Sequence, residues 1–263
     1  MEKYREIEKS IIKKFRKEIW SKFIKAVKKY KLVEENDKIA VGISGGKDSF
    51  LLAKCMQELK RHGQINFDLE FIIMNPGYSD KVMSTIRNNL KLLNIECKTF
   101  DTKIFEIADK MENGCYLCAK MRRGYLYDYA KKIGCNKIAL GHHLDDVVET
   151  ILLNLVFNGS YSSMLPKLSS DNFEGIELIR PLYLIEEKNI IAWRDYNELE
   201  FINCACSVTA KGGGKRKMVK EFIYSLEKLN KDVKKSILTS SSNVNLNTII
   251  GYKKDGNKFD KYQ

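Results

Sequence analysis

Apolar residues recur at every fourth position along residues 2–30, and lysines fill many of the positions between them. This spacing predicts an amphipathic helix, because residues four apart lie on the same side of an α-helix. The apolar stripe can pack on the core of the same chain or on a partner subunit, while the basic side can face solvent or RNA. The stripe consists of Ile7, Ile11, Phe15, Ile19, Phe23 and Val27.

Between residues 36 and 210, short apolar and β-branched runs alternate with longer amphipathic segments. The short runs predict strands, and the longer segments predict helices. The alternation predicts an α/β fold with a five-stranded, mostly parallel sheet and helices on both faces, preceded by an N-terminal helical extension. The predicted strands are 38–43, 69–74, 96–100, 137–140 and 176–179, and the predicted helices are 48–62, 79–93, 121–133 and 145–157.

The pattern divides the chain into three parts. Residues 1–35 form the basic amphipathic helix, and residues 36–210 form the α/β domain. Residues 211–263 comprise a basic loop, a helix and a tail. Within this last part, residues 236–263 are rich in Ser, Asn and Lys and weakly periodic, which predicts a mobile tail or a surface extension.

The charge balance narrows the choice of partner. The chain has 263 residues and a net charge of +12, which favours a polyanion such as a nucleic acid, although a lysine-rich proteome would also produce it. No apolar run approaches the length of a membrane-spanning helix, and residues 1–15 lack the apolar core of a secretory signal. The sequence therefore predicts a cytoplasmic protein that does not enter a membrane.

A glycine-containing motif lies between the first predicted strand and the helix that follows it. Its residues are Ser44, Gly45, Gly46, Lys47, Asp48 and Ser49. Glycines and a helix N-terminus present backbone N–H groups to a phosphate, and Lys47 can neutralise phosphate charge. A carboxylate facing phosphates implies either a bridging cation or a capped helix start, so Asp48 makes bridging Mg²⁺ a reasonable prediction. The spacing differs from the Walker A motif. A turn without a ligand is the alternative.

A second motif follows the fourth predicted strand and contains Gly141, His142, His143, Asp145 and Asp146. Ligands of parallel sheets bind at the carboxyl ends of strands, where both motifs fall. Two imidazoles beside two carboxylates can move protons or hold a cation. The alternative is that Asp145 caps the next helix and the histidines fill the turn.

Seven cysteines, without a secretion signal, argue against a disulfide framework. Cys55, Cys97 and Cys135 stand singly in apolar segments and are predicted to be core residues. The remaining four suit three kinds of site: a four-cysteine zinc site, a redox disulfide, or an iron–sulfur cluster held by three cysteines. The sequence lacks a thioredoxin-like setting for the disulfide. The four are Cys115 and Cys118 in a CxxC motif, and Cys204 and Cys206 in FINCACSVT.

The first motif resembles the PP-loop of the ATP pyrophosphatase superfamily. With GHHLDD it resembles a signature shared by tRNA lysidine synthetases and tRNA 2-thiocytidine synthetases. The segment CYLCAKMRRGYLYDYAKKIGCNKIALGHHLDD is similar to the latter. The lysidine synthetases lack the cysteine set. The resemblance spans roughly residues 36–210, which makes this part a catalytic domain.

The resemblance implies an ATP-dependent tRNA sulfurtransferase. It implies that ATP and Mg²⁺ activate the C2 position of a pyrimidine, cytidine 32 of tRNA, with release of pyrophosphate. A 4Fe–4S cluster then delivers sulfur. It implies three cluster ligands, Cys115, Cys118 and Cys206, with Cys204 as the alternate third ligand. Cys-Ala-Cys departs from the family, which has two residues between these cysteines.

The same resemblance implies which motif residues take part in catalysis and which bind the nucleotide. Asp48, His142, Asp145 and Asp146 are candidates for catalysis, with His143 beside them. The nucleotide-site candidates are Ser44, Gly45, Gly46, Lys47, Asp48, Ser49, Met74 and Gly141.

Basic residues near the cysteines are the candidates for contacts with RNA phosphates. They are Lys120, Arg122, Arg123, Lys215 and Arg216, and a solvated basic loop is the alternative for the last two. The expected partners are tRNA and a sulfur donor, either a cysteine desulfurase or sulfide, and the sequence is compatible with a homodimer. Two other functions stay open: a 2-thiouridine synthetase or other sulfur-inserting relative, and a zinc-stabilised nucleotide- and RNA-binding protein without turnover.

Overall fold

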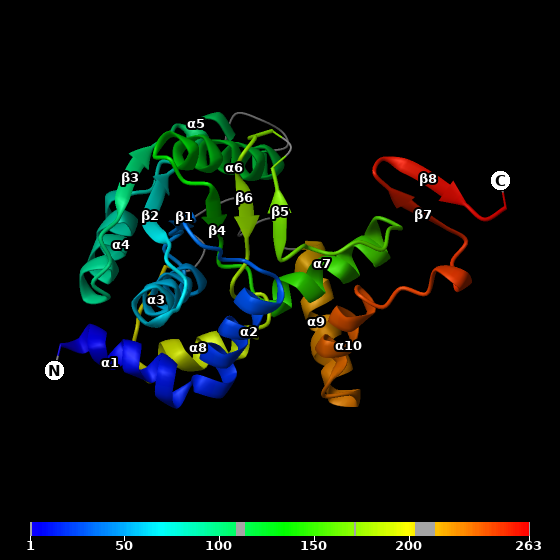
Figure 1. Cartoon of the computed structure of the whole chain (residues 1–263), viewed down its shortest axis with the longest axis horizontal. Helices are drawn as coiled ribbons and strands as arrows, with labels where there is room; N and C mark the ends of the chain where they lie inside the picture. The colour runs from blue at the N-terminus through cyan, green and yellow to red at the C-terminus, as the bar shows by residue number, and fades with distance from the viewer. Residues whose placement is uncertain (1, 109–113, 171, 203–213, 263) are drawn as a thin grey trace.

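The computed structural model describes residues 2–108, 114–170, 172–202 and 214–262. Its centre is a six-stranded sheet with the strand order β3-β2-β1-β4-β6-β5 (Figure 1). The first five of these strands are parallel and confirm the five predicted ones. They are β1 (Lys38–Gly42), β2 (Asp68–Asn75), β3 (Lys98–Asp101), β4 (Lys137–Ala139) and β6 (Glu177–Ile179).

The sixth strand was not predicted. β5 (Lys167–Ser169) pairs antiparallel to β6 at the edge of the sheet. The strand has only three residues and little burial, so it is too short for a period-two pattern to be recognised in the sequence. The formation of β5 therefore depends on its backbone hydrogen bonds to β6.

Alternate residues of the strands face two different cores. Ile39 and Val41 join a core with Phe50, Leu51 and Trp193, whereas Ala40 joins a second core with Tyr127 and Ile138. Successive side chains of a strand point to opposite faces, so a sheet covered on both faces needs apolar residues throughout. This requirement explains why the strands are continuous apolar runs in the sequence.

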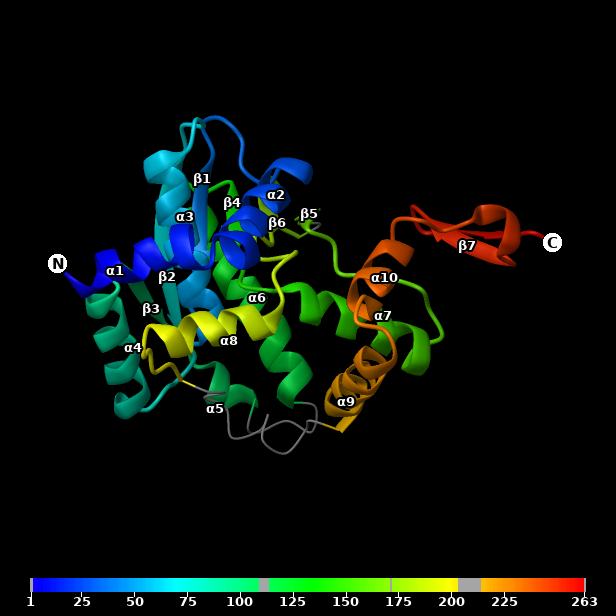
Figure 2. The ribbon, with the colours of Figure 1, turned by 90° about the horizontal axis from the view of Figure 1, so that it is seen from below.

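The helices form one layer on each face of the sheet. α3 (Lys47–His62), α4 (Asp80–Leu92), α8 (Glu187–Tyr196) and the N-terminal helices cover one face, and α6 (Gly114–Lys132) covers the other, with α5 (Ile104–Ala108) beside it (Figure 1). In Figure 2, which is seen from below, α1 and α8 both lie on the side of the sheet that faces the viewer. No helix in the described part of the chain is long and apolar enough to cross a membrane.

The N-terminal helix contains two wider π-helical segments. Residues four apart on a regular α-helix are rotated by about 40°, so the six-residue apolar stripe would wind halfway round it. The N–H groups of Phe15 and Trp20 instead donate to carbonyls five residues back, on Ser10 and Phe15. All six stripe residues are consequently buried in the core of this chain. The segments are α1 (Lys3–Lys9), η1 (Ser10–Lys14), η2 (Arg16–Trp20) and α2 (Ser21–Lys29).

The C-terminal part is more structured than the sequence predicts. α9 (Gly214–Leu229) packs Val219 and Ile223 against Leu144 and Val148 of α7 (Leu144–Phe157). After α9 come α10 (Val233–Ser240), a 3₁₀ turn (Leu246–Thr248) and a hairpin of β7 (Gly251–Lys254) and β8 (Asn257–Asp260). The hairpin lies apart from the sheet, beyond α7 (Figures 1 and 2).

A buried lysine joins the amino ends of several strands. Lys137, at the start of β4, is 2% exposed and forms ion pairs with Asp37 (2.7 Å), Glu34 (2.8 Å) and Glu177 (3.6 Å). Lys167 of β5 also contacts Glu34 and Glu177, at 3.0 Å each, but is 27% exposed. Lys137 is therefore the cation that neutralises the buried carboxylate of Asp37.

Replacing Lys137 by Met should lower the free energy of unfolding by about 3–5 kcal/mol, because the carboxylate of Asp37 would stay buried without its cation. The control Lys167→Met should lower it by less than about 1 kcal/mol, since that ion pair is partly solvated. Urea unfolding at pH 7 measures both variants. Equal losses would contradict the assignment of Lys137 as the buried cation.

Candidate active site

The loop between β1 and α3 is held in one conformation by its own side chains. Gly45 has φ +89°, and a Cβ at this position would lie 2.4 Å from Ile202 Cδ1. The Ser49 hydroxyl donates to the carbonyl of Gly46 at 2.9 Å and accepts from the N–H of Ser44 at 3.2 Å. The loop is thus shaped before any ligand binds, with the N-terminus of α3 directly behind Gly46.

The two sequence motifs meet at the carboxyl edge of the sheet. β1 and β4 are neighbouring parallel strands, so the residues that follow them are adjacent. A Cβ at Gly141 would lie 3.0 Å from the carbonyl carbon of Asp48. His143 Nε2 lies 3.8 Å from Asp48 Oδ1. The structure therefore brings SGGKDS and GHHLDD together, as their positions after two strands predicted.

Three buried polar atoms of this site have no hydrogen-bond partner in the described part of the chain, although His143 Nδ1 lies 3.5 Å from Asp146 Oδ2. They are Asp48 Oδ1, His142 Nδ1 and His143 Nδ1. A buried polar atom left unsatisfied costs about 1–3 kcal/mol, so three in one place indicate a missing ligand. A nucleotide with its cation fits this donor and acceptor set.

The pKa values of Asp48 and His142 are shifted in opposite directions. Burial raises the pKa of Asp48, although Lys47 and His143 oppose the shift. Burial, with help from Arg180, lowers the pKa of His142 to about 4. His142 is consequently neutral at neutral pH and can accept a proton.

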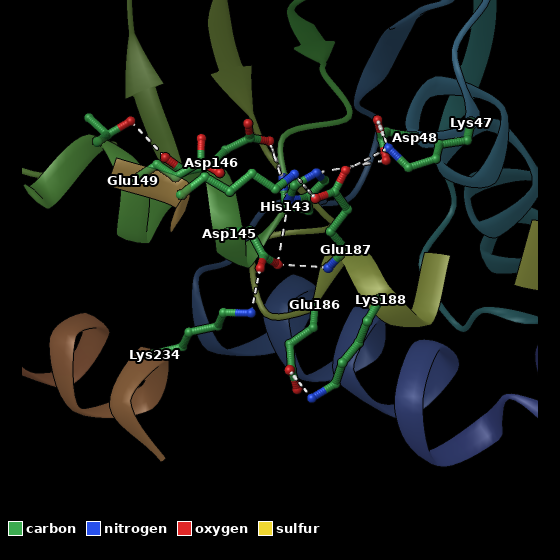
Figure 3. Close-up of polar contacts among 12 residues, drawn as sticks. Lys47, Asp48, His143, Asp145, Asp146, Glu149, Glu186, Glu187, Lys188 and Lys234 are labelled. Atoms are coloured by element: carbon green, nitrogen blue, oxygen red, sulfur yellow. Dashed lines mark hydrogen bonds and ion pairs between the residues drawn. The ribbon is translucent and has the colours of Figure 1, made fainter. Parts of the chain in front are cut away.

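Asp145 and Asp146 hold the site together. Asp146 Oδ2 accepts the N–H of His143 at 3.0 Å and so caps α7, while its Oδ1 pairs with Arg216 at 2.8 Å. Asp145 Oδ2 accepts the N–H of Glu187 at 2.7 Å, and Oδ1 pairs with Lys234 at 2.8 Å (Figure 3). Asp145, a sequence candidate for catalysis, thereby links α7, α8 and α10.

Glu187 is a site residue that the sequence analysis missed. Its carboxylate contacts Lys47 at 3.1 Å (Figure 3). It also contacts Lys220 of α9 at 2.6 Å. Burial alone would raise the pKa of Glu187, but Lys220 and Lys47 lower it to about 2. No local pattern marks this glutamate, because its partner Lys47 lies 140 residues away in the chain.

The basic candidates for RNA binding lie in different surroundings. Arg216, assigned to RNA from the sequence, forms ion pairs with Asp146 (2.8 Å) and Glu149 (2.7 Å), so it belongs to the acidic cluster of the site. The ammonium of Lys215 lies 5.2 Å from the centre of the Phe157 ring. Arg122 lies over the Phe105 ring, and Lys120 and Arg123 are exposed. Met74, a nucleotide-site candidate, is buried near the end of β2.

Cys115 and Cys118 lie at the start of α6. Since α6 precedes β4, it runs antiparallel to the strands, and its first turns lie at the carboxyl edge of the sheet. The Cys118 side chain is partly buried. The Cys115 side chain and the whole of Cys204 and Cys206 lie outside the described residues. Within the described residues, no three His, Cys, Asp or Glu side chains form a metal site.

The other cysteines have the environment of core thiols. Cys55 and Cys135 are buried and Cys97 is partly buried. Burial raises the pKa of all three, to about 12 for Cys97 and about 11 for Cys135. A metal ligand must be a thiolate, so these cysteines are unsuited to that role.

A preformed glycine loop after β1, facing a histidine- and carboxylate-bearing turn after β4, defines a nucleotide-binding α/β protein. The model of the PP-loop domain matches residues 15–209, and the chain belongs to this family. It is 38% identical over 224 residues to the tRNA-cytidine(32) 2-sulfurtransferases of Geobacter metallireducens and Geobacter sulfurreducens, covering 84% of this chain and 87% of each relative.

A solved structure is also similar. The U34-tRNA thiolase NcsA from Methanococcus maripaludis with its [4Fe-4S] cluster superimposes with a TM-score of 0.68 at 25% identity. The match covers 89% of this chain and 80% of NcsA. The predicted family and the parallel α/β architecture are both confirmed.

Gly45→Ala should lower the free energy of unfolding by about 1–3 kcal/mol and weaken MgATP binding, because φ is positive and the new methyl group meets Ile202. Gly46→Ala is the matched control for stability: its Cβ would meet nothing within 3.4 Å, so the change should stay within about 0.5 kcal/mol. Urea unfolding and calorimetric titration of MgATP measure the two effects. Equal stability of both variants would contradict the prediction.

The unfolding free energy should depend on pH through His142. Because the folded pKa of about 4 lies below the unfolded value, the unfolded chain binds an extra proton between about pH 6.5 and 4. The stability contributed by neutral His142 is therefore full above this window and is lost as pH falls through it. Between pH 7 and pH 5, wild type should lose about 1–2 kcal/mol more than His142→Gln. Parallel urea-unfolding curves for the two proteins would contradict this.

Proposed function

We propose that this protein is an ATP-dependent tRNA sulfurtransferase that replaces the C2 oxygen of cytidine 32 by sulfur. The observation that carries the proposal is the convergence of three buried polar atoms, on Asp48, His142 and His143, at the sheet edge where the CxxC helix α6 begins. None of the three has a hydrogen-bond partner among the described residues. The similarity to tRNA-cytidine(32) 2-sulfurtransferases supports the choice of base. The similarity to NcsA, named as a U34-tRNA thiolase, supports the chemistry.

The loop residues bind and orient ATP. Backbone N–H groups of Gly45, Gly46 and the start of α3 face the phosphates, and the Ser44 hydroxyl adds a further donor. Lys47 supplies positive charge, with Glu187 holding its ammonium in place at 3.1 Å. Asp48 presents an unpartnered carboxylate oxygen to Mg²⁺. Attack by the C2 oxygen on the α-phosphate then releases pyrophosphate.

The histidine turn handles the proton of the acceptor base. Neutral His142 accepts a hydrogen bond or a proton from the activated pyrimidine, and Asp146 fixes the turn by capping α7. Cys115, Cys118 and Cys206, with Cys204 as the alternate ligand, would hold a 4Fe–4S cluster, and such a cluster would supply the sulfur chemistry. The donor that restores this sulfur is a cysteine desulfurase or sulfide. We place the enzyme in the cytoplasm and propose that it can act as a homodimer.

The test is the reaction itself. Protein purified without oxygen is incubated with a tRNA transcript, MgATP and sulfide, and the nucleosides are analysed by mass spectrometry. We expect ATP-dependent formation of 2-thiocytidine, with AMP and pyrophosphate as co-products, and no thiolation of a transcript with uridine at position 32. Asp48→Asn should abolish the product, because Mg²⁺ loses its ligand. Formation of 2-thiouridine instead would move the chain to the alternative sulfur-inserting enzymes.

Metal content provides a separate prediction. Anaerobically purified wild type should contain about four irons per chain, as expected for one cluster. Cys115→Ala and Cys118→Ala should lose this iron, and so should one of Cys204→Ala and Cys206→Ala, because each removes a thiolate ligand. Cys135→Ala, which changes a buried thiol, is the control that keeps its iron. One zinc and no iron would exclude the sulfur chemistry and favour a zinc-stabilised RNA-binding protein.

A further inference from the structure

Arg180 is a buried guanidinium without a carboxylate partner in the described part of the chain. It follows β6 directly and is 8% exposed. Its Nη1 donates to the carbonyl of Leu165, and its Nε is buried and has no hydrogen-bond partner. Burying a charge without its counterion is costly, so an anion is expected at this position in the working enzyme.

Two lysines buried elsewhere in the described chain each have a carboxylate partner. Lys54 and Lys137 are at most 2% exposed, and each forms an ion pair, with Glu8 at 2.6 Å and with Asp37 at 2.7 Å. The carboxylate that acts on Arg180 at longer range is Asp146, which already pairs with Arg216 at 2.8 Å. No described carboxylate is therefore available to neutralise Arg180, and the anion that pairs with it must come from outside the described residues.

The position of Arg180 separates it from the ATP loop. β6 pairs with β4, and β1, which carries the loop, lies on the other side of β4. Leu178 of β6 packs in the same core as Tyr127 of α6, and Arg180 follows two residues later, so it lies on the side of the sheet that α6 covers. Its charge also acts on His142 and on Arg123 of α6. The exposed Arg123 forms no ion pair among the described residues.

We propose that Arg180, together with Arg123, binds a backbone phosphate of the RNA substrate next to the base that is modified. This deepens the proposed function and rests on it. A guanidinium presents a planar pair of N–H donors that matches two phosphate oxygens, and a phosphate between two arginines removes their mutual repulsion. A base that leaves its stack to reach His142 needs its backbone held, which is what phosphate contacts provide.

The same chemistry could come from the triphosphate of ATP, so the test measures both ligands. Fluorescence anisotropy gives the Kd of labelled tRNA over a range of salt concentrations, and calorimetry gives the Kd of MgATP. For Arg180→Gln we expect about tenfold weaker tRNA binding and a salt slope smaller by about one, with MgATP binding unchanged. Arg180→Lys should retain the slope but lose part of the affinity, because an ammonium lacks the planar fork.

Two further variants keep the test decisive. Arg123→Gln changes an exposed side chain, so it stays folded if Arg180→Gln does not, and it should also reduce the salt slope by about one. Arg194→Gln, on α8 and paired with Asp195 at 2.7 Å, is the matched control and should leave tRNA binding unchanged. Weaker MgATP binding with unchanged tRNA binding would assign the anion to ATP and overturn the proposal.

Unchanged binding of both ligands in folded Arg180→Gln and Arg123→Gln would also overturn it. The proposed function can fail separately. If wild type binds tRNA with Arg180-dependent affinity but forms no thionucleoside, the sulfurtransferase assignment fails and the phosphate site stands. If wild type forms 2-thiocytidine and both variants bind tRNA as wild type does, only the phosphate site fails.

Discussion

The carboxylate of Asp145 is the contact on which the geometry of the site depends. One oxygen accepts the N–H of Glu187 at the start of α8, and the other pairs with Lys234 of α10. Because the side chain of Glu187 reaches Lys47 and Lys220, this contact also aligns the ATP loop with α9. Asp145, Glu187 and Lys234 are largely removed from water, so these charges need their partners in place, whereas Lys220 is exposed. The site is consequently rigid before a substrate arrives.

This arrangement fixes the charge state of the site over a wide pH range. Lys220 and Lys47 hold the pKa of Glu187 near 2, so its carboxylate stays charged at any pH at which the protein works. Its contribution to stability is present above the ordinary glutamate pKa and is lost only as pH falls toward about 2. Meanwhile His142, with a pKa near 4, stays neutral. The loop thus keeps a charged cradle for phosphate beside an uncharged proton acceptor.

The N-terminal and C-terminal segments serve this site from outside the sheet. The N-terminal helix buries its apolar stripe against the core that also contains Trp193 of α8, which supports the helix that begins at Glu187. α9 and α10 place Arg216, Lys220 and Lys234 over the acidic residues of the site. A period of four was recognisable in the sequence. The π-helical turns that keep the stripe on one side were not, because they consist of backbone hydrogen bonds between residues five apart, which no side-chain pattern records.

The sequence by itself determined the features that depend on neighbouring residues. Period-two and four-residue patterns and glycines before a helix act over short stretches, so the five parallel strands, the phosphate loop and the histidine turn were predictable. The helix predicted over residues 121–133 begins earlier in the structure, at Gly114, and therefore includes the CxxC motif. Only the tertiary structure decided that Glu187 holds Lys47 and that Asp145 joins three helices. It also decided that Arg216 pairs with the acidic residues of the site, whereas Arg180 has no carboxylate partner among the described residues. These contacts join residues far apart in the chain, and ion pairs carry no periodicity. Their partners are therefore chosen by folding, through burial and distance, and no local pattern records them.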